Sequence, residues 1–164
     1  MRAQANFRKL GLAATAGLAI LAGPGRAQAT LPNLGGTWLV SVQLADCTSG
    51  AAVAPPFTSL LAFTGTGTET EVTNNPALQP GQRTTGLGVW TFTSANHYHL
   101  NAYALILFPS TTGPHPIAAG SQQIHQDIVL NINTWTSKAT IQFFDLTGKQ
   151  TGAGCATATA ARLM

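Results

Sequence analysis

Residues 36–47 read GTWLVSVQLADC, a run in which apolar and polar side chains alternate. Successive side chains of a β-strand point to opposite sides of the sheet, so this run has two distinct faces. The apolar face comprises Trp38, Val40, Val42 and Leu44. The opposite face comprises Thr37, Ser41, Gln43 and Cys47. Such a strand is typical of an antiparallel sheet that packs on a core with one side and meets water with the other.

A second run with the same alternation lies near the other end of the chain, where residues 155–162 read CATATAAR. Antiparallel pairing that sets Trp38 opposite Arg162 leaves Cys47 and Cys155 only two residues out of alignment. The same register places both cysteines on the polar outer faces, and Trp38 and Arg162 inside. A first strand that pairs with the last closes the sheet, so the two runs together predict a barrel.

The sequence between these runs supplies six further strands and no helix. Apolar residues do not recur at helical spacing, whereas β-branched and aromatic residues dominate. The predicted strands span residues 36–46, 57–64, 68–74, 86–94, 97–108, 117–133 with a bulge, 138–145 and 150–162. We therefore predict a single all-β domain at residues 30–164, an eight-stranded antiparallel up-and-down barrel without substantial helix, because closure hides both sheet edges.

Residues 1–29 have the composition of a secretory signal peptide. Three basic residues within 1–9 precede an uncharged apolar stretch at 10–23, and Ala-Gln-Ala at 27–29 supplies the small residues of a cleavage site. The apolar stretch is shorter than the ~20 residues that a membrane-spanning helix needs. We predict cleavage after Ala29, no integral membrane anchor afterwards, and a secreted or periplasmic protein.

Removal of this segment changes the charge balance. The whole chain has a formal charge of +3, but residues 30–164 keep four basic residues against five acidic ones, a formal charge of −1. No basic patch remains to hold phosphates, so we expect no nucleic-acid partner. Export also places Cys47 and Cys155 in an oxidising compartment, where a disulfide between them is expected.

The triplet Gly36-Thr37-Trp38 at the start of the first predicted strand, together with Arg162 at the end of the last, resembles the lipocalin-like (calycin) barrels. The resemblance implies structural roles for Gly36, Trp38 and Arg162: the indole packs at the closed end, and the basic side chain lies across it in a cation–π contact. It also implies a ligand pocket at the open end, lined by inward side chains. Dirigent and allene-oxide-cyclase-like barrels share the eight-stranded plan and imply a catalytic alternative.

Alternation along the strands selects the side chains that we expect to line this pocket. The candidates are Val40, Val42, Leu44, Trp90, Phe92, Tyr98, Leu100, Ala102, Ala104, Ile128, Leu130 and Phe143. Small inward residues such as Ala158 and Ala160 leave volume, while Tyr98 and Gln126 would be polar groups in an apolar wall. A barrel filled by its own side chains is the alternative.

The histidines do not indicate a metal or catalytic centre. His97 and His99 lie two apart on one strand face, but the opposite face is apolar, so both are expected to point to solvent; no third ligand is recognisable. His125 and Asp127 also share a face, and without a nucleophile motif we interpret them as a solvated pair. We expect no metal and no cofactor.

Two acidic residues and one tryptophan remain to be placed in the strand pattern. Glu69 and Glu71 share a face beside a hairpin and are flanked by threonines, so we expect them to be exposed; acid–base catalysis would need one of them buried. Trp135 is placed in a turn, as a surface aromatic or part of an interface, and its role stays open.

These observations favour an exported carrier of a small hydrophobic molecule over an enzyme. The first alternative is a barrel cyclase or isomerase acting on an apolar substrate, which a buried Tyr98 or Glu71 with a shifted pKa would favour. The second is a structural or outer-membrane barrel. Tyr103, Leu105 and Leu107 would form an outward apolar patch, which makes a homo-oligomer an additional expectation.

Overall fold

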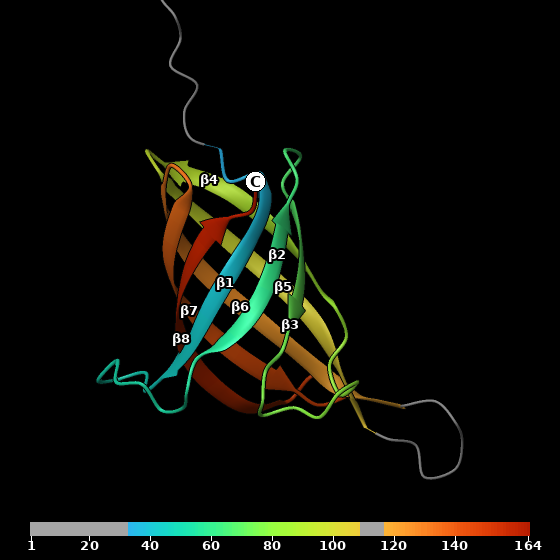
Figure 1. Cartoon of the computed structure of the whole chain (residues 1–164). Helices are drawn as coiled ribbons and strands as arrows, with labels where there is room; N and C mark the ends of the chain where they lie inside the picture. Colours follow the sequence, from blue (N-terminus) through green and yellow to red (C-terminus); the bar gives the residue numbers. More distant parts are fainter. Residues whose placement is uncertain (1–32, 109–116) are drawn as a thin grey trace, which may run out of the picture.

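The computed structural model describes residues 33–108 and 117–164, which form a closed barrel of eight antiparallel strands (Figure 1). The strands are β1 (Gly36–Ala45), β2 (Phe57–Phe63), β3 (Thr68–Thr73), β4 (Gly86–Ser94), β5 (His97–Phe108), β6 (Ile117–Asn131), β7 (Thr134–Phe144) and β8 (Gln150–Arg162). Each strand pairs with its neighbour in sequence, and β1 pairs with β8. The predicted up-and-down barrel is confirmed; the predicted signal peptide lies outside the described residues.

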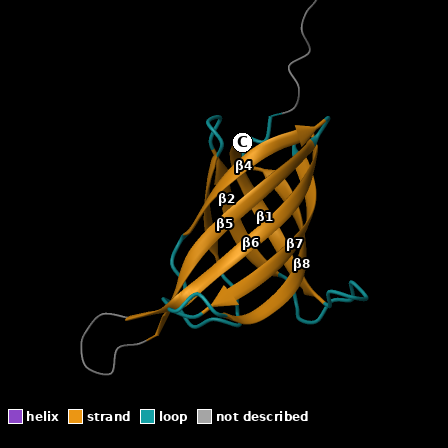
Figure 2. Cartoon of the chain, turned by 180° about the vertical axis from the view of Figure 1, so that it is seen from behind, coloured by secondary structure: helices purple, strands orange, loops and turns teal. Residues whose placement is uncertain are grey.

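Barrel closure follows the register that the terminal strands predict. Trp38 pairs with Arg162 and Ala45 pairs with Cys155, without interruption between them. The strands run obliquely around the barrel, and the described C-terminus lies at the same end as the start of β1 (Figures 1 and 2). This end is therefore built from the first residues of β1 and the last residues of β8.

The pairing of β6 with β7 differs from the prediction. β7 begins at Thr134 rather than at residue 138, because Ile132 and Asn133 alone form the turn, with Ile132 at a φ of 53°. Trp135 is consequently a strand residue and only 1% exposed, so its placement in a surface turn is wrong. Strand alternation turns it inward, opposite Ala160 on β8.

The predicted bulge in β6 is present. The register between β5 and β6 shifts between Ile106 and Leu107. Gly120 lies at the shift with a φ of 155°, and a Cβ there would come within 2.0 Å of the Phe144 carbonyl oxygen. Only glycine allows the two backbones to approach this closely.

Trp38 closes one end of the barrel. Its indole is fully buried, donates a hydrogen bond of 2.9 Å to the Leu34 carbonyl, and packs on Trp135 with 6.2 Å between ring centroids. The Arg162 guanidinium carbon lies 4.2 Å from the centroid of the Trp38 ring. This cation–π contact is the arrangement that the lipocalin-like resemblance implies.

Gly36 is required by the same closed end. The Arg162 guanidinium donates hydrogen bonds to the carbonyls of Gly35 and Asn33. Gly36 has a φ of 124°, and a Cβ there would lie 2.6 Å from Nη1 of Arg162. A side chain at this position would strain the backbone and displace the guanidinium.

A disulfide joins the opposite end of β1 to β8. Cys47 and Cys155 are bonded as predicted, with 5.1 Å between their Cα atoms and a sequence separation of 108. Disulfides persist in oxidising compartments, so the bond indicates a location outside the cytoplasm. Within the described ranges, no helix is long and apolar enough to cross a membrane.

Part of the outer surface is apolar. Tyr103 and Leu105 face outward on β5, 51% and 53% exposed, as alternation predicts, whereas Leu107 is half-buried. Leu87 on β4 is the cross-strand neighbour of Tyr103 and is also exposed, so it belongs to the same apolar surface.

Candidate functional site

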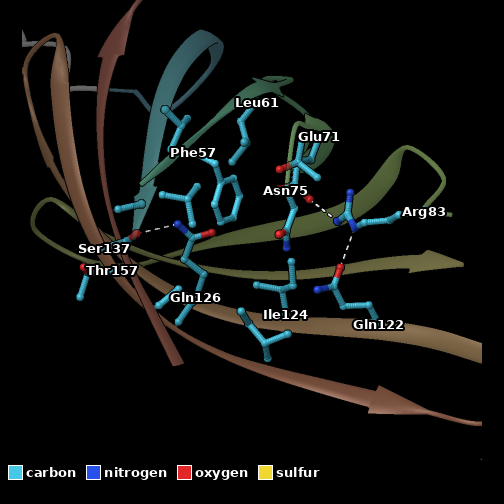
Figure 3. Close-up of a pocket in the computed structure, with 17 residues that line it drawn as sticks. Phe57, Leu61, Glu71, Asn75, Arg83, Gln122, Ile124, Gln126, Ser137 and Thr157 are labelled. Carbon is cyan, nitrogen blue, oxygen red and sulfur yellow. Dashed lines mark hydrogen bonds and ion pairs between the residues drawn. The ribbon is translucent and has the colours of Figure 1, made fainter. Parts of the chain in front are cut away.

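A cavity occupies the half of the barrel away from Trp38. It has a volume of about 50 Å³, which is room for a few water molecules or a small ligand group. Its walls come from β1, β2, β3, β6, β7, β8 and the loop between β3 and β4 (Figure 3). The barrel interior is thus filled with side chains at one end and hollow at the other.

One side of the cavity is apolar. Its wall is formed by aliphatic and aromatic side chains and by small alanines: Val40, Val42, Phe57, Leu61, Ile124, Ala139, Ile141, Ala156 and Ala158. Alternation explains the set, because each is an inward position of its strand. The alanines of β7 and β8 leave space that larger side chains would fill.

The other side of the cavity is polar and centres on Arg83. Arg83 donates through Nη2 to the Glu71 carboxylate and through Nε to the Gln122 side-chain oxygen at 2.5 Å (Figure 3). The side chains of Arg83 and Glu71 are only 6% and 12% exposed. Charges removed from water must be paired, and here each satisfies the other.

The loop that carries Arg83 is fastened to β5. Arg83 forms an isolated bridge with Ile106. The Thr84 amide donates to the Leu105 carbonyl at 3.0 Å, and the Leu107 amide donates to the Gln82 carbonyl at 2.7 Å. These backbone hydrogen bonds hold the guanidinium over the cavity, so its position does not depend on the side chain alone.

Glu69 lies two residues before Glu71 on the same inward face of β3. It is 2% exposed, and neither of its carboxylate oxygens has a hydrogen-bond partner. Burial and the nearby Glu71 carboxylate raise its pKa to about 8, with Arg83 opposing the shift. At neutral pH Glu69 is therefore mostly a neutral carboxylic acid.

The expectation that Glu69 and Glu71 are exposed is wrong. In β3 the threonines at 68 and 70 take the outward positions, so alternation turns both glutamates into the barrel. Two glycines of β4 make room for them: a Cβ at Gly86 would lie 2.9 Å from Glu71 Oε2, and one at Gly88 would lie 2.7 Å from Glu69 Oε2.

Smaller hydrogen-bonded groups complete the polar wall. Gln126 donates through Nε2 to the Ser137 hydroxyl at 2.6 Å, in the buried part of the wall. The sequence predicts Gln126 as a polar group in an apolar wall, and Gln126 lines the cavity. The side chain of Asn75 also lines the cavity, and its oxygen accepts a hydrogen bond of 2.9 Å from the Ala77 amide.

The predicted lining residues divide according to their depth in the barrel. Val40 and Val42 line the cavity. The closed-end core and the side chains packed on it contain Trp90, Tyr98, Leu100, Ala102, Ile128 and Leu130. Leu44 and Phe143 are half-buried outside the cavity lining, Ala104 is buried, and Phe92 is 49% exposed against Tyr98. Alternation identifies the inward face, but it does not give the distance of a residue from the open end.

Apart from Gln126, the strand pattern does not indicate the residues of the polar wall. Arg83 lies in a proline-containing loop, and no strand pattern assigns it a direction. One signal could have indicated the buried acids: Gly86 and Gly88 are alternate residues of a predicted strand, and glycine in a strand often marks a close approach by a neighbour.

The histidines lie outside the cavity on β5 and β6. His99 Nδ1 lies 2.8 Å from Asp127 Oδ1, and His125 Nδ1 lies 2.5 Å from Asn101 Oδ1. His97 is exposed. Among the residues that the structure describes, no group of three or more histidine, cysteine, aspartate or glutamate side chains is placed to hold a metal ion.

Comparison with models of known protein families and with curated protein sequences finds no match to this chain. The closed eight-stranded barrel, with Arg162 over Trp38, is consistent with a lipocalin-like fold. Fold and cavity geometry therefore supply the basis for a functional assignment.

Proposed function

We propose that this protein is an exported, lipocalin-like barrel that binds a small, mainly apolar molecule in the cavity between β1, β2, β3 and β6–β8. The observation that carries the proposal is the cavity itself, which combines an apolar wall with a few polar groups at one side. This composition is typical of small-molecule sites. The closed end, filled by Trp38, Trp135 and Arg162, leaves the other end for ligand entry.

The size of the cavity limits the ligand. A volume of about 50 Å³ accommodates a short chain or one end of a longer molecule, unless side chains at the open end move. Burial of each methylene group would stabilise the complex by ~0.8 kcal/mol, so even a short chain gains useful affinity.

The first test is native mass spectrometry of the protein purified from its exported compartment, followed by denaturing extraction of any bound molecule. We expect a stoichiometric small molecule with an apolar part. Calorimetric titration with hexanol supplies a second test that needs no natural ligand, and we expect saturable binding.

A cavity-filling variant locates the site. Ala156→Leu places three additional carbons in the cavity wall and should abolish hexanol binding, whereas Ala153→Leu on the exposed face of the same strand should leave it unchanged. An empty protein that also fails to bind hexanol, or hexanol binding unaffected by Ala156→Leu, would refute a ligand site in this cavity.

A barrel cyclase or isomerase is the second candidate, and the pair of buried glutamates favours it. Glu69 has a pKa of about 8 and holds a proton, whereas Glu71 is paired with Arg83 as a carboxylate. Two carboxyl groups in different protonation states can serve as acid and base. Incubation of an extracted ligand with the protein, followed by chromatography of its isomers, tests this function; turnover should be lost in Glu71→Gln.

A further inference from the structure

Two carboxyl groups and one cation lie in or beside the polar end of the cavity. Glu71 and Arg83 line it as an ion pair, and Glu69 lies two positions away on β3, outside the lining and against Gly88. The facing positions of β6 are the amides Gln122 and Gln126, and the elements paired with β3 add no further charge. Tyr98 of β5 is the remaining titratable side chain nearby, in the core at the closed end. While Glu69 holds its proton the cluster is neutral, and ionisation of Glu69 gives it a net charge of −1.

We propose that this end of the cavity binds a protonated amine, so that the ligand is a small amphiphile with a cationic head and an apolar tail. The inference rests on the proposed function, because it assigns the chemistry of the ligand to the same cavity. The apolar wall would receive the tail, and the carboxylate of Glu71 would accept hydrogen bonds from the ammonium group.

The hydrogen bonds of Arg83 argue against an anionic ligand. Its Nη2 and Nε atoms are engaged by Glu71 and Gln122, and its Nη1 atom faces the Thr84 carbonyl at 3.4 Å. A carboxylate ligand would have to compete with Glu71 for the guanidinium and would lie beside a second carboxyl group. The amide NH2 groups of Gln122 and Asn75 can donate to a hydroxyl or carbonyl oxygen, but they add no charge that would hold an anion.

The unpartnered carboxyl group of Glu69 is a second, independent argument for a cationic ligand. A buried carboxyl group without any hydrogen-bond partner is costly, and such groups in folded proteins call for an explanation. Glu69 lies two positions from the cavity-lining Glu71, about 7 Å along the strand. A cation bound at Glu71 would favour ionisation of Glu69 and compensate its charge, so binding of the amine would release a proton.

The experiment compares three six-carbon ligands by isothermal titration calorimetry: hexylamine, hexanol and hexanoate. We expect hexylamine to bind about tenfold more tightly than hexanol, the equivalent of one charge-assisted hydrogen bond, and hexanoate to bind most weakly. The affinity for hexylamine should increase as the pH rises from 6 to 9, because the alkylammonium stays charged while Glu69 loses its proton.

Variants distinguish the effect of the two glutamates on ligand binding from the effect of the protein's overall charge. Glu71→Gln should remove the preference for hexylamine over hexanol, and Glu69→Gln, which keeps the Arg83 pair, should remove the pH dependence. Asp127→Asn deletes a negative charge from the outer surface and should change neither. Circular dichroism confirms that each variant is folded; should Glu71→Gln fail to fold, the three-ligand comparison and Glu69→Gln still decide the result.

The outcomes distinguish this inference from the proposed function. Hexanoate binding as tightly as hexylamine, or a preference for hexylamine that Glu69→Gln and Glu71→Gln leave intact, would overturn the amine site while leaving a ligand-binding barrel. Failure of all three ligands to bind would refute the proposed function as well.

Discussion

At the scale of single residues, the unpartnered Glu69 makes stability depend on pH. Its pKa is about 8 in the folded protein and about 4.5 in the unfolded chain, so the unfolded state loses the proton first as pH rises. The contribution of protonated Glu69 to the unfolding free energy is therefore fully present below pH 4.5 and is lost between pH 4.5 and 8. The full loss is roughly 5 kcal/mol, since each pKa unit corresponds to about 1.36 kcal/mol. Denaturant unfolding at pH 5, 7 and 9 measures this decline.

Glu69→Gln is the matched variant for this measurement, because the amide fills the same space without titrating. We expect its unfolding free energy to decline less between pH 5 and 9 than that of the unaltered protein. Two parallel pH curves would mean that Glu69 is ionised to the same extent in the folded and unfolded states.

A second residue-scale prediction concerns Arg83. Arg83→Met leaves the Glu71 carboxylate buried without its cation, and we expect a loss of about 3–5 kcal/mol of unfolding free energy at pH 7. The double variant Glu71→Leu/Arg83→Met removes both charges and should recover most of that loss. Lys149→Met, in an exposed turn, is the control for removal of a positive charge. Equal losses in the single and double variants would show that the pair is not coupled.

At the scale of strands, the glycines of β4 are expected to be irreplaceable where they face the glutamates. A Cβ at Gly88 would lie 2.7 Å from Glu69 Oε2 and 2.9 Å from the Asn101 carbonyl oxygen, so Gly88→Ala should destabilise the barrel by about 1–3 kcal/mol. Gly154→Ala on β8 is the matched control, because nothing lies within 4 Å of the added methyl group. Thermal unfolding measures both; similar melting temperatures would show that β4 relaxes around the methyl group.

The strand pattern also explains how far the sequence could predict this molecule. Alternation assigned Trp38, Val40 and Val42 to the inside, and the register of β1 with β8 followed from two residue pairs. The pattern did not locate the polar wall, because it treats a carboxylate as an outward residue even where a strand places it inside. The burial of Glu71 depends on its ion pair with Arg83, which lies in a loop twelve positions later in the chain.

At the scale of the whole molecule, position along the barrel axis separates an end filled by side chains from an end that contains the cavity. The inward faces of β5 and β6 supply Leu100, Ile128 and Leu130 to the closed-end core. Nearer the start of β6, Ile124 and Gln122 line the cavity. A single strand therefore contributes to both ends, and depth depends on strand tilt and register, which are properties of the closed sheet.

The disulfide should make one of the larger contributions to the stability of the barrel. Cys47 and Cys155 are 108 residues apart, and in the chain-entropy model a loop of about 100 residues restricts the unfolded chain by ~4.7 kcal/mol. Reduction, or the double variant Cys47→Ser/Cys155→Ser, should lower the unfolding free energy by up to that amount while leaving the β1–β8 pairing and the closed barrel intact. Denaturant unfolding with and without reductant measures the effect, and the double variant should not respond to reductant. Unchanged stability on reduction would mean that β1 and β8 already remain close in the unfolded chain, so that the bond adds no further restriction.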